Sequence, residues 1–329
     1  MNMERILIIG ANGQIGSELV EALAAQYGSE NVIATDIAPG PSRHAVHYEP
    51  LDVLDASRLA ALVERFGITQ IFHLAALLSA TGETRPLQAW TLNMNGLLNV
   101  LELAREHNAR HPEKGLRVFW PSSIAAFGPH TPAVETPQLA IMDPTTMYGI
   151  SKQAGERLCE YYFTKFGVDV RSLRYPGVIS YKTPPGGGTT DYAIDIFQAA
   201  RRGETYTCFL KEDATLPMIY MPDAVRATLE LMDAEASRLR VRSSYNVAGV
   251  SFDPATLAEA IARRVPGFTV KYAPDFRQAI AQTWPHTLDD THARYDWGWR
   301  PAFGLDAMVD DMLANVPLDW HAPALGNAA

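Results

Sequence analysis

Short apolar runs alternate with amphipathic helical patterns through the first half of the chain, and this alternation is its strongest constraint on the fold. The runs RILIIG, NVIATD and IFHLAA end at residues 10, 36 and 76. Helical patterns follow them, the longest near residues 86–111. Strands separated by helical crossovers pair in parallel, with helices on both faces of the sheet. The sequence therefore predicts an α/β fold, a doubly wound parallel sheet.

Three glycines follow the first apolar run directly. Gly10, Gly13 and Gly16 form GANGQIG before an amphipathic helix, with Gln14 and Ile15 between the last two. Glycines here permit a tight turn and a close approach of backbone to a pyrophosphate, while the helix N-terminus offers free N–H groups. The spacing GxxGxxG differs from the GxGxxG of many dehydrogenases, but its position favours a Rossmann dinucleotide site.

An acidic residue ends the second predicted strand. Asp36 lies 20 residues after Gly16, where a carboxylate binds both hydroxyls of an adenine ribose and repels a 2′-phosphate. NAD is therefore favoured over NADP as cofactor. Asp52 and Val53 follow the third strand and are candidates to meet the adenine, although Asp52 alone also fits a turn cap.

The sequence pattern of the chain changes after residue 180. The stretch SYKTPPGGGTTDYA is a Pro/Gly loop, and shorter strands and helices follow it. We predict a smaller, interleaved C-terminal α/β substrate domain. The expected boundaries are 1–179 plus about 216–248 for the NAD-binding domain, about 180–215 plus 249–316 for the substrate-binding domain, and 317–329 for a frayed tail.

Composition restricts the classes of partner. The 329 residues are 47% hydrophobic and 20% charged, with a formal net charge of -9. An acidic chain has no electrostatic footprint for nucleic acid or an anionic membrane surface, so small molecules are the expected partners. The two cysteines, Cys159 and Cys208, do not suggest a disulfide framework, and no apolar run is long enough to span a bilayer. We expect a cytoplasmic protein without a metal site.

Two Tyr-x-x-x-Lys pairs occur on one predicted helix, YGISKQAGERLCEYYFTKFG. Tyr148 with Lys152 lies in its first turn, and Tyr161 with Lys165 lies deep within it. Thirteen residues at about 100° each rotate the second tyrosine roughly 220° from the first, so the two pairs face nearly opposite sides. A phenol that acts as a base near neutral pH needs its pKa lowered by about two to three units, which takes roughly 3 to 4 kcal/mol. The helix N-terminus and Lys152 favour the first pair for this role, while the second pair is expected to pack and be solvated.

A serine pair completes the expected catalytic group. Ser122 and Ser123 end the predicted strand RVFWPSS, and the C-terminal ends of parallel strands meet at the edge where the glycine loop lies. We expect them beside Tyr148.

Together, GANGQIG, Asp36, HLAA at 73–76, LNMNG at 92–96, PSS at 121–123 and YGISK at 148–152 resemble the extended short-chain dehydrogenases/reductases. The resemblance implies Ser123, Tyr148 and Lys152 as the catalytic trio. It further implies that cofactor contacts come from Leu74, Ala75, Asn93, Tyr148, Lys152 and Tyr175.

The second half resembles the short-chain type of L-threonine 3-dehydrogenases. Pro176 and Gly177 follow Tyr175, where nucleotide-sugar epimerases carry Phe-Asn. The resemblance implies oxidation of the β-hydroxyl of L-threonine to 2-amino-3-oxobutyrate, which leads to glycine and acetyl-CoA or to aminoacetone. The implied substrate contacts are Ser79, Ser123, Tyr148, Gly188, Thr189, Thr190 and Trp284.

The resemblance also implies a homodimer with a four-helix interface that includes the Tyr148 helix. Met147, Leu158 and Tyr162 are candidates for that contact, and core packing explains them equally well. Two other functions remain as alternatives, an NAD-dependent nucleotide-sugar epimerase or dehydratase and a non-catalytic NAD sensor. Retention of the Tyr148/Lys152 pair counts against the sensor.

Overall fold

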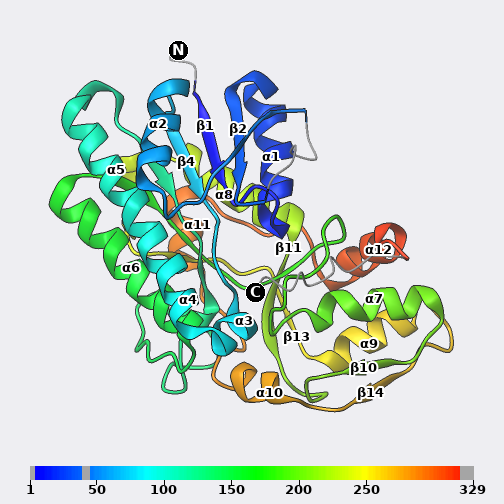
Figure 1. The fold of residues 1–329 in the computed structure, drawn as a ribbon. Coiled ribbons are helices and arrows are strands. Elements are labelled where there is room, and N and C mark those ends of the chain that lie inside the picture. The colour runs from blue at the N-terminus through cyan, green and yellow to red at the C-terminus, as the bar shows by residue number, and fades with distance from the viewer. Residues whose placement is uncertain (1–3, 39–44, 319–329) are drawn as a thin grey trace.

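A six-stranded parallel sheet forms the centre of the computed structural model, which describes residues 4–38 and 45–318 (Figure 1). Its strands pair in parallel, for example Ile6 with Val32 and Ile6 with Gln70 on the two sides of the first strand. In spatial order they are β3 (His47–Pro50), β2 (Val32–Asp36), β1 (Ile6–Ile9), β4 (Gln70–His73), β5 (Arg117–Phe119) and β7 (Asp169–Arg171). The order reverses at β1, which confirms the predicted doubly wound sheet.

Alternate residues of β1 enter two different cores. Ile6 and Ile8 pack with α1 and α8, whereas Leu7 and Ile9 pack with α2, α5 and α6. Successive side chains of a strand point to opposite faces, so a strand covered on both sides must be apolar throughout. The helices on the first face are α1 (Gln14–Tyr27), α8 (Met221–Asp233) and α11 (Thr291–Trp297), and those on the second are α2 (Ala56–Phe66), α5 (Gly96–Arg110) and α6 (Met147–Phe166).

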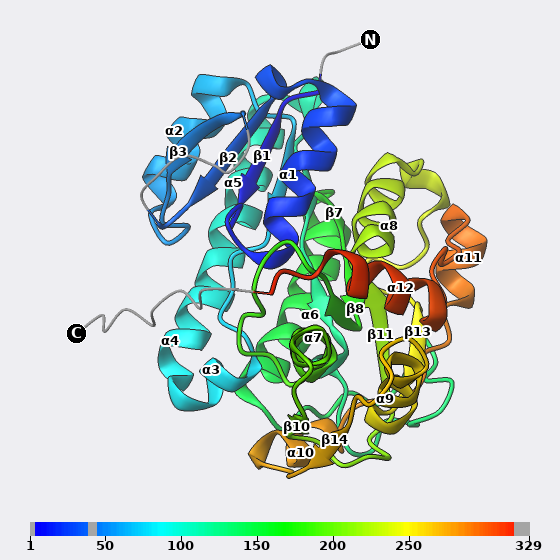
Figure 2. The ribbon, with the colours of Figure 1, turned by 90° about the vertical axis from the view of Figure 1, so that its right-hand side faces the viewer.

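Three smaller sheets continue below this layer (Figure 2). A third apolar core joins two of these sheets to four of the remaining helices, while the other sheet contributes to the core on the first face of the central sheet. The strands are β6 (Ser122–Ser123), β8 (Leu173–Tyr175) and β12 (Tyr245–Asn246); β9 (Gly177–Ile179), β11 (Leu216–Tyr220) and β13 (Val250–Phe252); and β10 (Tyr206–Cys208) with β14 (Val270–Tyr272). The helices are α3 (Ser79–Thr84), α4 (Pro86–Trp90), α7 (Tyr192–Arg202), α9 (Pro254–Ala262), α10 (Phe276–Ala281) and α12 (Leu305–Asn315). Of the tail expected at 317–329, residues 319–329 lie outside the described part.

The sequence predicts both ends of helix α6, since Pro144 with Thr145 or Thr146 marks a helix start and Gly167 a left-handed cap. The structure confirms both. The Thr146 hydroxyl accepts a hydrogen bond from the Gly149 N–H, and Gly167 takes a left-handed conformation with φ 71° at the C-terminus. A serine or threonine cap satisfies a free N–H of the first turn, and glycine adopts positive φ without a steric penalty. These caps fix which residues occupy the first turn, and Tyr148 is one of them.

The long helix expected at 86–111 is not uniform. A π-helical turn, Thr91–Asn95, separates α4 from α5 without ending the rod. Such turns are rare and occur often at functional sites. This one contains Asn93, which turns its side chain toward the end of β4, as described below.

Among the described residues, the structure has no helix long and apolar enough to cross a membrane.

Candidate active site

The glycine loop lies between β1 and α1, where no larger residue fits. Gly10 has φ +86°, and a Cβ added to it would lie 2.8 Å from the backbone N of Ala75. A Cβ on Gly16 would lie 2.2 Å from the Gly10 carbonyl oxygen. Gly13 is the N-cap of α1 and provides no side-chain hydrogen bond to the first turn. The N–H groups of that turn therefore remain available to an anionic ligand, as a pyrophosphate site requires.

Asp36 lies beside this loop at the end of β2. Its carboxylate accepts hydrogen bonds from the Asn12 N–H at 3.0 Å and the Ala38 N–H at 3.3 Å. Asp52 is exposed and accepts from the Leu54 N–H at 2.9 Å, so it caps a turn, while Val53 is buried. Asp36 thus lies next to the glycine loop, whereas Asp52 lies in the turn that follows β3.

A cavity of about 600 Å³ extends from the glycine loop to the Pro/Gly loop. It brings most of the predicted site residues together although they come from distant parts of the sequence. Those at its wall are Gly10, Gly13, Gln14, Ile15, Gly16, Leu74, Ser79, Ser123, Tyr148, Lys152, Tyr175, Gly188, Thr189, Thr190 and Trp284. The predicted residues outside its wall are Asp36, Asp52, Val53, Ala75 and Asn93.

Tyr148 and Lys152 lie together in this cavity with ionisation properties set by burial. The Lys152 Nζ donates to the Pro121 carbonyl at 2.6 Å and lies 5.5 Å from the centre of the Tyr148 ring. Burial lowers the pKa of Lys152 to about 7, although Cys159 and Glu156 act in the opposite direction. Burial raises the pKa of Tyr148 to about 12, against a hydrogen bond with Ser123. The expected lowering of the phenol pKa is therefore not present, because desolvation of the phenolate outweighs the hydrogen bond with Ser123.

The second Tyr/Lys pair lies away from the cavity, as predicted. The side chain of Tyr161 is 52% exposed and its ring packs at 5.7 Å from that of Phe166, while Lys165 is exposed. Its neighbour Tyr162 is buried and donates a hydrogen bond to Glu102. Tyr162 is thus a core residue, which resolves one of the two readings left open for it.

A buried ion pair that the sequence did not reveal lies next to the predicted catalytic residues. Glu156 and Arg174 are almost fully buried, and two guanidinium nitrogens reach the carboxylate at 2.9 and 2.7 Å. Ser122 donates to the same carboxylate at 2.6 Å. Arg174 further donates to the side chain of Asn246 at 3.0 Å. Glu156 is one turn beyond Lys152 on α6, a spacing visible in the sequence, but nothing in the sequence pairs it with Arg174.

Asn93 fixes the segment that follows β4. Its side-chain oxygen accepts from the Leu77 N–H at 2.9 Å, and its nitrogen donates to the Leu77 carbonyl at 3.1 Å and to the Ser151 hydroxyl at 3.2 Å. The π-helical turn thereby joins the cavity wall to α6. Asn93 acts through these contacts and not by reaching the cavity.

The Pro/Gly loop is held at both ends. The Thr189 hydroxyl lies 3.3 Å from that of Ser79, and both residues are buried. Asp191 accepts hydrogen bonds from the Gly187 and Gly188 N–H groups at 2.9 and 2.6 Å. Burial raises the pKa of Asp191 to about 6, despite these two bonds. Asp191 was also missed, because its partners are backbone groups.

The start of the same loop is tied to α1. Gln14 donates to the Ser180 hydroxyl at 2.9 Å, and the hydroxyls of Ser17 and Thr183 lie 3.0 Å apart. Lys182 reaches Glu21 at 2.6 Å. Figure 2 shows this green segment passing close to the end of α1. The helix that follows the glycine loop therefore also holds the loop on the other side of the cavity.

Comparison with known proteins agrees with this architecture. Residues 6–248 match the model of the NAD dependent epimerase/dehydratase family. The chain belongs to the NAD dependent epimerase/dehydratase family. An uncharacterized epimerase/dehydratase of Staphylococcus haemolyticus is 48% identical over 319 residues, which cover 95% of this chain and 98% of the relative.

Two solved structures extend the comparison. A GalE-like L-threonine dehydrogenase from Cupriavidus necator, in its holo form, is 63% identical with a TM-score of 0.91, over 94% of this chain and 99% of that one. A monomeric L-threonine 3-dehydrogenase from a metagenome is 44% identical with a TM-score of 0.89, over 94% of this chain and 98% of that one. A nicotinamide cofactor thus fits this member of the epimerase/dehydratase family, since the uncapped first turn of α1 opens into the cavity.

We predict that Glu156→Gln destabilises this family member strongly. The variant leaves the buried Arg174 charge uncompensated, which costs about 3–5 kcal/mol in the free energy of unfolding. It also lowers the pKa of Lys152 further, because the Glu156 charge raises it. Urea unfolding measures the first effect. Glu160→Gln on the same helix removes only a surface ion pair with Arg157 and should cost about 0–1 kcal/mol; equal losses in both variants would contradict the role given to Glu156.

A second prediction concerns the pH dependence of stability. Because the pKa of Asp191 in the folded chain, about 6, exceeds the usual 3.8, its contribution to stability is present at low pH and lost as the pH rises through 6. Asp191→Asn has no carboxyl group to ionise and so does not lose stability in this way. The variant should therefore have a higher melting temperature than the wild type at pH 7.5 but not at pH 4.5. Asp310→Asn is the control with the opposite sign, since Arg264 lowers the pKa of Asp310. A gain for Asp191→Asn that is equal at both pH values would overturn the assignment.

Proposed function

We propose that this chain oxidises the β-hydroxyl of L-threonine with NAD, giving 2-amino-3-oxobutyrate, NADH and a proton. The observation that supports this most is the single cavity that joins the glycine loop, Ser123, Tyr148 and Lys152 to the Pro/Gly loop. The 63% identity with a threonine dehydrogenase over nearly the whole chain supports the choice of substrate. The product would go to a ligase that forms glycine and acetyl-CoA, or lose carbon dioxide to give aminoacetone.

The catalytic roles follow from the positions of three side chains. Tyr148 takes the proton of the β-hydroxyl, and Ser123, which is hydrogen-bonded to it, orients the same oxygen. When bound, NAD supplies the nicotinamide ring that accepts hydride from the β-carbon. Lys152 supplies a positive charge near the phenol and holds the nicotinamide ribose. Burial disfavours both the phenolate and the ammonium ion, while the hydrogen bond with Ser123 favours the phenolate and the Glu156 charge favours the ammonium ion.

The choice of NAD over NADP rests on Asp36. Its carboxylate at the end of β2 is positioned beside the glycine loop, where it would bind ribose hydroxyls and repel a phosphate. The residues proposed to hold NAD are Gly10, Gly13, Gln14, Ile15, Gly16, Asp36, Asp52, Val53, Leu74, Ala75, Asn93, Tyr148, Lys152 and Tyr175. Asn93 would do so through the backbone that it fixes.

The substrate site is proposed at the opposite end of the cavity. A small zwitterion needs hydroxyl and N–H donors for its carboxylate and a cover that excludes water during hydride transfer. The buried hydroxyl pair of Ser79 and Thr189 offers such donors. Gly188, Thr190 and Trp284 complete the wall there.

Measurement of NADH absorbance with purified protein, NAD and L-threonine tests the activity. We expect a signal in the wild type that Tyr148→Phe abolishes, because phenylalanine cannot take the proton. Tyr161→Phe, the matched control on the same helix, should retain it, and NADP should replace NAD poorly. No signal above a control without threonine would overturn the proposal, and conversion of a nucleotide sugar without release of NADH would favour an epimerase or dehydratase.

We also propose a homodimer through α4 and α6. Apolar side chains remain exposed on these two helices: Leu87, Trp90, Ile150, Tyr161 and Phe166 are 82%, 40%, 39%, 52% and 42% exposed. Such a surface is typical of an interface. A relative described as monomeric shows that the fold does not require a dimer.

Light scattering after gel filtration tests the dimer. The wild type should give twice the chain mass of 36.2 kDa, and Leu87→Glu should give the mass of one chain. A wild-type mass of one chain would contradict this proposal.

A further inference from the structure

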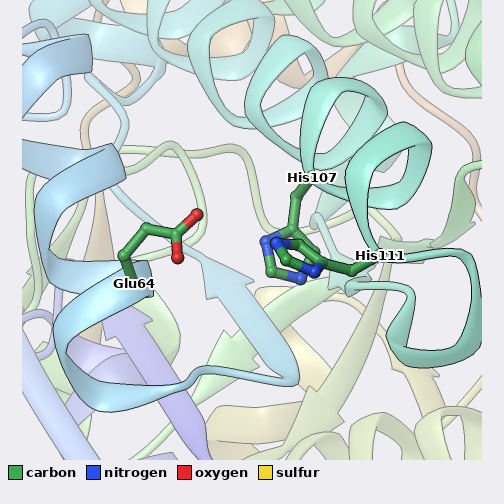
Figure 3. A group of neighbouring side chains, drawn as sticks. All are labelled: Glu64, His107 and His111. Carbon is green, nitrogen blue, oxygen red and sulfur yellow. The ribbon is translucent and has the colours of Figure 1, made fainter.

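A group of metal-ligating side chains lies outside the candidate active site. Glu64 belongs to α2, and His107 and His111 lie at the end of α5. One potential ligand atom from each residue lies within 4.8 Å of the others. Figure 3 shows the two imidazoles side by side, facing the Glu64 carboxylate across the space between the helices.

The packing of α2 against α5 brings these residues together. Leu59, Leu62 and Val63 of α2 share one apolar core with α5, so the last turns of the two helices are held in contact. His107 and His111 are four residues apart and therefore lie on one face, with ring centres 4.7 Å apart. Both helices end at the edge of the sheet where the strands begin, opposite the cavity. The group is thus separate from the catalytic residues.

His107 already has the tautomer and the free ring nitrogen that a metal ligand needs. It is only 9% exposed, and its Nε2 lies 3.3 Å from the Lys114 carbonyl oxygen, to which it can only donate. This bond fixes the tautomer and leaves a lone pair on Nδ1, which is buried and has no hydrogen-bond partner among the described residues. Metal-bound histidines commonly donate their second nitrogen to a carbonyl in this way.

The charges around the group both favour and oppose a cation. Glu64 contributes a negative charge, while Arg110 reaches its Oε1 at 3.1 Å. Both of these side chains are about half exposed, so their ion pair is weak and screened. The second carboxylate oxygen of Glu64 remains available as a ligand.

We propose that Glu64, His107 and His111 bind one Zn²⁺ ion or a similar first-row divalent cation. Two imidazoles and a carboxylate form a set that suits Zn²⁺, with water in the fourth position. Tetrahedral coordination needs ligand atoms roughly 3.3 Å apart, so Glu64 and His111, both exposed, must rotate inward. The ion links α2 to α5. It thereby stabilises the packing of these two helices on the sheet.

Titration of tag-free, EDTA-dialysed protein with ZnCl₂ in a calorimeter tests the site. We expect one ion per chain in the wild type, and affinity at least about tenfold weaker in His111→Ala and Glu64→Gln. His130→Ala is the control, since His130 is exposed and pairs with Asp143 elsewhere. MgCl₂ should not compete, because Mg²⁺ prefers oxygen ligands.

Hydrogen exchange provides the second readout. Zn²⁺ should slow exchange in the last turns of α2 and α5 in the wild type and in His130→Ala, but not in His111→Ala. No saturable binding, equal affinity in the wild type and His111→Ala, or equal competition by Mg²⁺ would each overturn the site. If circular dichroism shows that His111→Ala is unfolded, Glu64→Gln takes its place in the binding and hydrogen-exchange comparisons with the wild type. None of these results depends on dehydrogenase activity.

Discussion

The buried pair of Glu156 and Arg174 is the interaction on which the geometry of the cavity depends. A buried ion pair contributes little by itself, because desolvation of the two charges offsets their attraction unless every polar atom finds a partner. Here the partners are supplied by Ser122 on β6, Asn246 on β12 and the Gln138 carbonyl. The pair therefore locks α6, which carries Tyr148 and Lys152, to the strand that presents Ser123. Its main effect is to fix the relative positions of the three side chains proposed for catalysis, which come from two separate elements.

The electrostatics of the cavity follow from the same burial. A site that excludes water strengthens every interaction within it, but it also resists the formation of isolated charge. Lys152 is enclosed by the Trp120 ring, with its Nζ 4.5 Å from the ring centre, and by the Pro121 carbonyl. Its pKa falls to about 7 while that of Tyr148 rises to about 12. Burial thus moves the two pKa values in opposite directions, because it disfavours the charged form of each group.

Local patterns in the sequence predicted what depends on local physics. The alternation of apolar runs and helical periods predicted the sheet, and Pro144 with the following threonines and Gly167 predicted the ends of α6. Helical rotation placed Tyr161 away from Tyr148. The sequence could not reveal contacts between distant segments, such as Arg174 with Glu156, Asp191 with its backbone donors, or Glu64 with two histidines on another helix. Nor could it give the direction of the Tyr148 pKa shift, which depends on how completely the folded chain removes water.

One face of α1 contacts the loop that crosses it. Gln14, Ser17 and Glu21 follow each other at helical spacing and hold residues 180–183, while the other face of α1 packs on the sheet. The chain thus has a fixed anchor immediately before its Pro/Gly loop and a second one at Asp191. Residues 184–186 lie between these two fastened ends, since Gly187, Gly188 and Thr189 are already held by Asp191 and Ser79. Substitutions there can alter which small molecule the cavity admits while the position of the glycine loop is preserved, which makes this segment the natural place for related chains to diverge in substrate.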